Sequence, residues 1–173
     1  MNQVRRFVIR RTFVVPMGLL MILTIALLAV VIFQCQPLAK VIILAISILP
    51  LAVLFVESAF RRVVIDQDGV KAFRPFRQRE IRFVDVTGLE SVRVRNRVFL
   101  TLEAGPDDFL IISNSYGDFP ALLECLIAAV PDGTVTEETQ QLAKQPPRRQ
   151  ADTFTVWFAL LAMIYVLIAQ FRS

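Results

Sequence analysis

The sequence predicts a membrane protein of the α+β class, in which three transmembrane helices flank one inserted soluble domain. Three apolar runs predict the helices, at residues 13–33, 38–56 and 153–171, and each is long enough to cross a hydrocarbon core of about 30 Å. A polar block at 61–131 predicts the domain, because short β-branched runs in it precede one apolar helical stripe. With 55% hydrophobic residues among 173, the chain is too apolar for an ordinary soluble domain.

Residues 1–60 form the first predicted unit, a basic N-terminus followed by a transmembrane hairpin. Its two apolar runs are joined by only four residues, so we expect the helices to lie antiparallel. Residues 132–152 are polar and contain a Pro pair, which predicts a linker with one short helix at Glu137–Lys144. Residues 153–173 are the third predicted transmembrane unit.

The arginines beside the apolar runs predict the orientation of the chain. Cytoplasmic flanks of transmembrane helices carry an excess of Lys and Arg. Eight arginines would share one side of the membrane, whereas only Lys40 and Arg172 would lie on the other. We therefore expect the N-terminus and the soluble domain to be cytoplasmic and the C-terminus to lie outside. The eight are Arg5, Arg6, Arg10, Arg11, Arg61, Arg62, Arg148 and Arg149.

The inserted domain is predicted to be a small antiparallel sheet that ends in an amphipathic helix. Apolar alternation predicts several short strands between residues 63 and 112, and apolar side chains three and four apart predict a helix over 119–130. Along one strand the valines are expected to face the core, and Arg93, Arg95 and Arg97 the solvent. The predicted core is Val64, Val70, Ile81, Val92, Val94, Leu100, Leu102, Ile111, Phe119, Leu123 and Leu126.

Charge is distributed unevenly along the domain. Residues 61–97 carry ten basic and five acidic side chains, whereas residues 98–131 carry five acidic and no basic ones. Three surfaces can neutralise the surplus arginines: the domain's own acidic half, an acidic partner, or the anionic inner leaflet. The sequence leaves all three open.

Few residues suit catalysis or metal binding. The chain has no histidine, and its two cysteines, Cys35 and Cys125, lie in different predicted units. The adjacent carboxylates Asp107 and Asp108 follow a Gly-Pro pair, which is typical of a solvated turn. Apart from Lys40 at an edge, the apolar runs hold no charged residue, which argues against transport by this chain alone. We therefore expect no enzyme activity, no cofactor and no metal.

A motif in the domain resembles a known family. An Asp-x-x-Gly-Val turn precedes a stretch of the form Ile-x-aromatic-x-Asp-Val-x-x-Leu, and together they resemble the membrane-anchored bacterial PH-like domains. The resemblance implies a PH-like antiparallel β-barrel or curved sheet closed by a C-terminal helix, in the bacterial cytoplasmic membrane. It also implies a binding or scaffolding role, and it brings no catalytic residues. The matching residues are Asp66, Gly69, Val70, Ile81, Phe83, Asp85, Val86 and Leu89.

Three functions fit these features. The first is a membrane-tethered interaction or scaffold module at the cytoplasmic face, which binds a membrane-protein partner or a second copy of itself. The second is recognition of anionic lipid headgroups, and the third is an accessory subunit of a membrane enzyme or transport complex. We expect the lipid bilayer as a partner, and no nucleic acid. The candidate residues for lipid or partner binding are Arg74, Arg77, Arg79, Arg93, Arg95 and Arg97.

Overall fold

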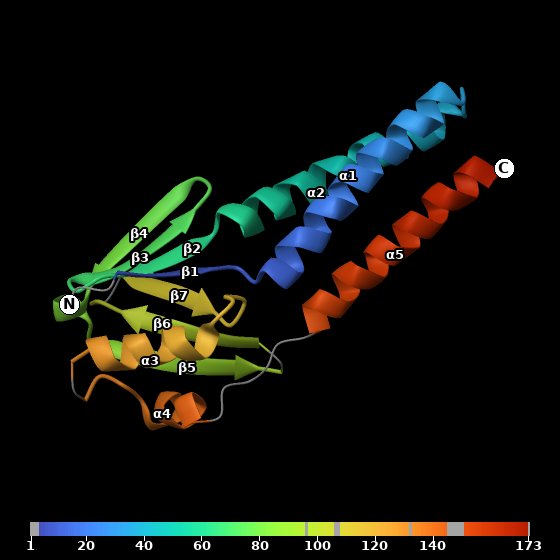
Figure 1. Ribbon diagram of the computed structural model, residues 1–173. Helices are drawn as coiled ribbons and strands as arrows, with labels where there is room; N and C mark the ends of the chain where they lie inside the picture. The colour runs from blue at the N-terminus through green and yellow to red at the C-terminus, as the bar shows by residue number, and fades with distance from the viewer. Residues whose placement is uncertain (1–3, 96, 106–107, 132, 145–150, 173) are drawn as a thin grey trace. The chain divides into compact units, whose positions relative to one another are not determined.

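The computed structural model contains two compact units (Figure 1). The sheet unit comprises residues 1–10 and 60–149, and the helical unit comprises residues 11–59 and 150–173. Within them, the described residues are 4–95, 97–105, 108–131, 133–144 and 151–172.

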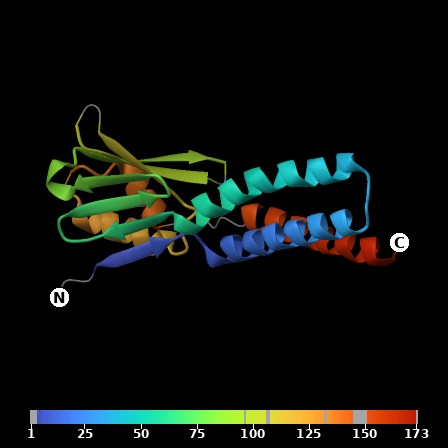
Figure 2. The same cartoon turned by 90° about the horizontal axis from the view of Figure 1, so that it is seen from above.

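The helical unit consists of long apolar helices, each able by length and composition to cross a membrane (Figure 2). They are α1 (Arg11–Phe33), α2 (Leu38–Phe60) and α5 (Ala151–Arg172). The three predicted apolar helices, two toward the N-terminus and one toward the C-terminus, are therefore confirmed. Both α1 and α2 extend beyond the predicted apolar runs by a few residues.

One stripe of α1 is buried within the helical unit. Helix α1 packs against α5, where Leu160 is buried. The Thr24 hydroxyl donates to the carbonyl oxygen of Leu20 at 2.8 Å, so this buried polar group is satisfied. No residue of α2 is buried, so its apolar side chains are accessible to the surroundings of the helical unit. The buried residues of α1 recur at steps of three and four: Met17, Leu20, Thr24, Leu27 and Val31.

The described part of the sheet unit contains two antiparallel sheets (Figure 1). The first has the order β1-β2-β3-β4 and the second has the order β5-β6-β7. The α+β class is confirmed, and of the two predicted forms, a barrel or a curved sheet, the barrel is not formed, because the sheets are not closed into one. The strands are β1 (Arg5–Val8), β2 (Arg62–Ile65), β3 (Gly69–Arg74), β4 (Arg77–Arg82), β5 (Gly88–Val94), β6 (Arg97–Glu103) and β7 (Phe109–Ser113). The helices are the single turn η1 (Phe83–Asp85), α3 (Phe119–Ala129) and α4 (Glu137–Lys144).

Strand β1 was not predicted from the sequence. Val8 of β1 and Arg62 of β2 are Cα partners, although the whole α1–α2 hairpin separates them along the chain. Phe7 and Ile9 are buried, and Ile9 forms a β-bridge with Tyr116. The basic N-terminus is therefore partly a strand of the sheet unit, and the helical hairpin takes the place of a β-turn between β1 and β2.

Part of the predicted linker packs on the sheet unit. Leu89 of β5 donates its N–H to the carbonyl oxygen of Thr134 at 2.8 Å and accepts from the N–H of Thr136 at 3.2 Å. Thr139 of α4 is buried, and its hydroxyl lies 3.4 Å from the same Leu89 carbonyl oxygen. Helix α4 has the bounds that the sequence predicts, but it belongs to the compact unit rather than to a free connection.

The core is built from alternate strand residues and from the apolar stripe of α3. Val92, Val94 and Ile111 are 50%, 54% and 40% exposed, so these three core predictions are wrong, as is half-buried Val64. At Ile111 and Val64 the residues on either side in the sequence are buried instead. An unbroken apolar run does not reveal which of its residues face inward. The confirmed core residues are Val70, Ile81, Leu100, Leu102, Phe119, Leu123 and Leu126.

Candidate functional site

Three of the predicted arginines lie on the core-facing side of the first sheet. In an antiparallel pair, directly opposed residues share a face. Ala72 of β3 pairs with Arg79 of β4, and Arg74 pairs with Arg77. Because Ala72 is buried and residues two apart share a face, all three arginines belong to the face on which the core lies. Charges at core-facing positions depart from the usual pattern, and they mark either functional sites or protected sheet edges.

These arginines form one wall of a cavity of about 180 Å³, which we call the groove. Residues 109–111 of β7 form the opposite wall. Since β4 and β7 are the last strands of their sheets, the groove lies between strand edges that have no neighbouring strand in the described part of the chain. A site this small suits a side chain or a headgroup rather than a large cofactor.

Arg79 connects the two walls of the groove. Its Nη1 donates to the carbonyl oxygen of Phe109 at 2.6 Å, and its guanidinium lies 5.5 Å from the centre of the Phe109 ring. The same Nη1 lies 3.5 Å from a carboxylate oxygen of Asp108. Arg79 therefore holds the two sheets together, and its charge is partly neutralised within the domain.

Arg74 and Arg77 differ from Arg79 because they are exposed and form no ion pair with any residue that the structure describes. They flank the β3–β4 turn, in which Phe76 is 99% exposed. Phe76 is not among the predicted site residues, although a large apolar residue in a polar turn is a visible signal. Two positive charges and one exposed aromatic ring are thus gathered at a single turn.

The second predicted group of arginines is not a row on one strand. Strand β5 ends at Val94, Arg95 follows with a positive φ of 54°, and Arg97 begins β6. Arg93 pairs with buried Val98, whereas Val94 pairs with Arg97, so Arg93 and Arg97 lie on opposite faces. The predicted solvent-facing row is therefore wrong, because the strand turns within it. All three arginines are nevertheless exposed around the β5–β6 turn.

The β3–β4 and β5–β6 turns lie at the same end of the sheet unit (Figures 1 and 2). Arg79 contacts Phe109 at the start of β7, and the groove continues from there toward the β3–β4 turn. Strand β7 runs in the same direction toward Ser113, which pairs with Phe99 beside the β5–β6 turn. We call the arginines around these two turns the basic end: Arg74, Arg77, Arg93, Arg95 and Arg97.

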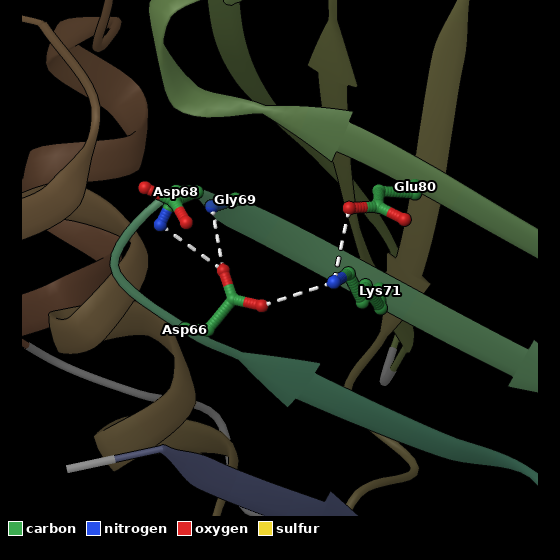
Figure 3. Close-up of polar contacts among 5 residues, drawn as sticks. All are labelled: Asp66, Asp68, Gly69, Lys71 and Glu80. Atoms are coloured by element: carbon green, nitrogen blue, oxygen red, sulfur yellow. Dashed lines mark hydrogen bonds and ion pairs between the residues drawn. The ribbon is translucent and has the colours of Figure 1, made fainter. Parts of the chain in front are cut away.

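Charged side chains at the other end of the first sheet pair with one another (Figure 3). Lys71 lies 3.3 Å from Asp66 and 3.0 Å from Glu80. Asp66 also accepts hydrogen bonds from the N–H groups of Asp68, at 3.1 Å, and Gly69, at 2.8 Å, which close the β2–β3 turn. Nearby, the Arg82 Nε donates to Asp85 at 2.8 Å. We call this set the ion-paired end: Asp66, Lys71, Glu80, Arg82 and Asp85.

The pKa values at the ion-paired end follow from these contacts. Burial alone would raise the pKa of the Asp66 carboxyl, but hydrogen bonds from the Gly69 N–H and from Lys71 hold it below its ordinary value. Hydrogen bonds to Glu80 and Asp66 raise the pKa of the Lys71 ammonium. Both shifts favour the charged forms, so this cluster acts as a structural ion-pair network at neutral pH.

The described residues contain no group of three or more His, Cys, Asp or Glu side chains that could hold a metal ion. A comparison with known protein families, curated proteins and solved structures finds no match. We therefore argue the function from the groove, the basic end and the chain's apolar helices.

Proposed function

We propose that the protein is a membrane-tethered, non-catalytic interaction and scaffold module with a PH-like domain at the cytoplasmic face. Antiparallel strands followed by the amphipathic helix α3 support the PH-like assignment, since this is the order that the resemblance implies. The matching motif residues also fit it: Gly69 opens β3, and Ile81, Phe83 and Leu89 are buried. Such residues specify a fold and not a reaction.

The β1–β2 pairing supports the proposed topology. Paired strands lie on the same side of a membrane, so the α1–α2 hairpin between them would cross it twice and return. Six arginines within residues 5–11 and 61–62 flank the hairpin, which favours the cytoplasm of a bacterial cell for that side. In the helical unit, the Gln170 amide donates to the side-chain oxygen of Gln34 at 2.6 Å. This bond supports a common side for the α1–α2 connection and the end of α5, which in the proposed topology is the outside.

The groove is the proposed binding site for a protein partner, and its two unneutralised guanidinium groups are the observation that supports this most. Arg74 and Arg77 are exposed and able to bind an anion, and a carboxylate can accept two hydrogen bonds from one guanidinium. Beside them, the edge of β7 beyond Phe109 has no strand partner among the described residues and offers backbone groups to an extended segment. The partner that fits both features is an acidic, extended segment of a membrane protein, either a subunit of a larger complex or a second copy.

Site-specific photo-crosslinking in cells would test this proposal. A crosslinking residue at position 111, in the groove wall, should yield one defined protein adduct, whereas the control at Val84, which is 80% exposed in η1, should not. The adduct should be lost when Arg74 and Arg77 are both changed to Gln. Identical adducts from positions 111 and 84 would contradict the proposal.

Recognition of a single anionic lipid headgroup is the second candidate function. Its support is the mixed lining of the groove, where three arginines lie opposite the apolar residues 109–111. In the same experiment, lipid adducts without protein adducts at position 111 would favour this candidate over a protein partner.

A further inference from the structure

The two exposed turns at the basic end also carry apolar side chains. Phe76 is 99% exposed, and Val92 and Val94, next to the β5–β6 turn, are about half exposed. Each of these side chains has an arginine beside it in the sequence. Surfaces that bind a membrane interface typically combine two features. Their arginines contact the lipid phosphates, and an aromatic ring enters the apolar layer beneath the headgroups.

The chain also leaves and re-enters the sheet unit at the basic end. Strand β1 ends at Val8, three residues before α1 begins at Arg11, and β2 begins at Arg62, two residues after α2 ends at Phe60. Arg62, the first residue of β2, pairs with Phe73, one residue before Arg74. Since adjacent strands lie about 4.8 Å apart, the β3–β4 turn begins within about two strand spacings of the points where the chain leaves for the spans.

The domain's own acidic groups do not account for the charge of the basic end. The ion pairs of the described residues involve Lys71, Arg79 and Arg82, and none involves Arg74, Arg77, Arg93 or Arg95. Four positive charges and three exposed apolar side chains thus share one end of the unit. An anionic bilayer surface offers a counter-charge and an apolar region together, which suits this combination of side chains.

We propose that the two turns of the basic end rest on the anionic surface of the bilayer that holds the chain's own helices, through Arg93, Arg95 and the inserted ring of Phe76. Arg74 and Arg77 remain with the groove. This inference rests on the proposed cytoplasmic tethering. The two turns would act as a second and third point of attachment, and they would fix the rotation of the sheet unit about its connections. The outer edge of β7 would then be presented to a partner in one orientation.

Fluorescence of a single tryptophan in the full chain would test this contact. The chain has one tryptophan, Trp157, so the change Trp157→Phe gives a background in which Phe76→Trp is the sole reporter. Reconstituted in vesicles rich in phosphatidylglycerol, the reporter at position 76 should emit at shorter wavelength and should be quenched several-fold more by interfacial spin-labelled lipid than a control reporter, Val84→Trp. The quenching should fall when Arg93 and Arg95 are changed to Gln, and in high salt, because exposed charges are then screened.

Equal quenching at positions 76 and 84, or quenching that is the same in purely zwitterionic vesicles, would overturn the inference. Both reporter sites are exposed, so the variants are expected to fold, and far-UV circular dichroism checks this. The outcome is separable from the proposed function. A protein adduct at position 111 without quenching at position 76 would leave the interaction module in place and remove only the bilayer contact.

Discussion

The two ends of the sheet unit treat charge in opposite ways. At the ion-paired end, Lys71 and Arg82 each lie within 3.3 Å of a carboxylate oxygen. At the basic end, Arg74, Arg77, Arg93 and Arg95 form no ion pair with any described residue. The comparison indicates that charge serves the fold at one end and is available to an external surface at the other.

This difference corrects the sequence-level picture of a basic half and an acidic half. Lys71 and Glu80 both belong to the basic half, and they pair within it. Arg79 and Asp108 are the one ion pair of the described residues that joins the two halves. The surplus positive charge therefore gathers at one end of the sheet unit, because the β3–β4 and β5–β6 turns, which carry these arginines, both lie there.

Removing a core side chain between the two ends should cause the largest loss of stability. Leu123 of α3 is fully buried, so Leu123→Ala should lower the free energy of unfolding of the sheet unit by about 2–5 kcal/mol. Exposed Glu124 in the next position provides the control, and Glu124→Ala should cost little. Thermal unfolding of the full chain in mild detergent measures both. Equal melting temperatures would show that α3 does not cover the core.

Gly69 tests how tightly the ion-paired end is packed. A Cβ added there would overlap the carbonyl oxygen of Ile81 and lie 2.9 Å from the Cα of Arg82, so β3 and β4 would have to move apart. We expect Gly69→Ala to cost about 1–3 kcal/mol, as overpacking does elsewhere. Gly88→Ala is the matched control, because its Cβ would come no nearer than 3.5 Å to Glu103. An unfolding curve in which both variants behave alike would refute the close approach.

A smaller effect than those of Leu123→Ala and Gly69→Ala is expected from pH, because the shifted pKa values of Asp66 and Lys71 make the stability of the ion-paired end depend on pH. The pKa of Asp66 is lowered in the fold, so its contribution is present above the unfolded pKa of about 3.9 and is lost as the pH falls below it. The pKa of Lys71 is raised, so its contribution is present at neutral pH and is lost as the pH rises through and beyond about 10.4. Melting temperatures of wild type and Asp66→Asn should therefore converge at acid pH. A constant difference down to pH 2 would argue against the Asp66 contacts.

The smallest effect on stability is expected at the basic end. Arg93 and Arg95 are exposed, and changing both to Gln should alter the free energy of unfolding by less than about 0.5 kcal/mol. Binding to anionic vesicles or recovery of a partner should fall in the same variant. Lost stability with unchanged binding would show instead that these arginines act within the domain.

Hydropathy and capping signals predicted the elements that depend on local sequence. The three long helices follow from run length, and α3 follows from Asp118, whose side chain accepts from the Ala121 N–H at 3.4 Å, and from the apolar stripe after it. Helix α4 has the predicted bounds, and its acidic first turn and basic last turn suit the helix dipole.

The features that were not predicted have a shared physical cause. Pairing between segments far apart in the sequence produces no recognisable pattern within either short segment. Strand β1 is a four-residue basic segment, so its charge suggested only a cytoplasmic flank, and its partner β2 lies beyond two helices. In β5, alternation of Val92 and Arg93 gave the wrong face, because both faces are exposed near the turn. Of the groove, only the arginines were predicted as site residues. The opposite wall, residues 109–111, comes from the other sheet, and the sequence does not show that the two sheets meet there.

The central claim is that the sheet unit lies on the cytoplasmic side of the membrane, and cysteine accessibility tests it most directly. In a Cys125→Ser background, Ser91→Cys places a thiol in β5, and exposed Cys35 in the α1–α2 connection serves as the internal reference. A membrane-impermeant maleimide added to intact cells should label position 35 and leave position 91 unlabelled, and lysis should then expose position 91. Labelling of position 91 from outside intact cells would contradict the account.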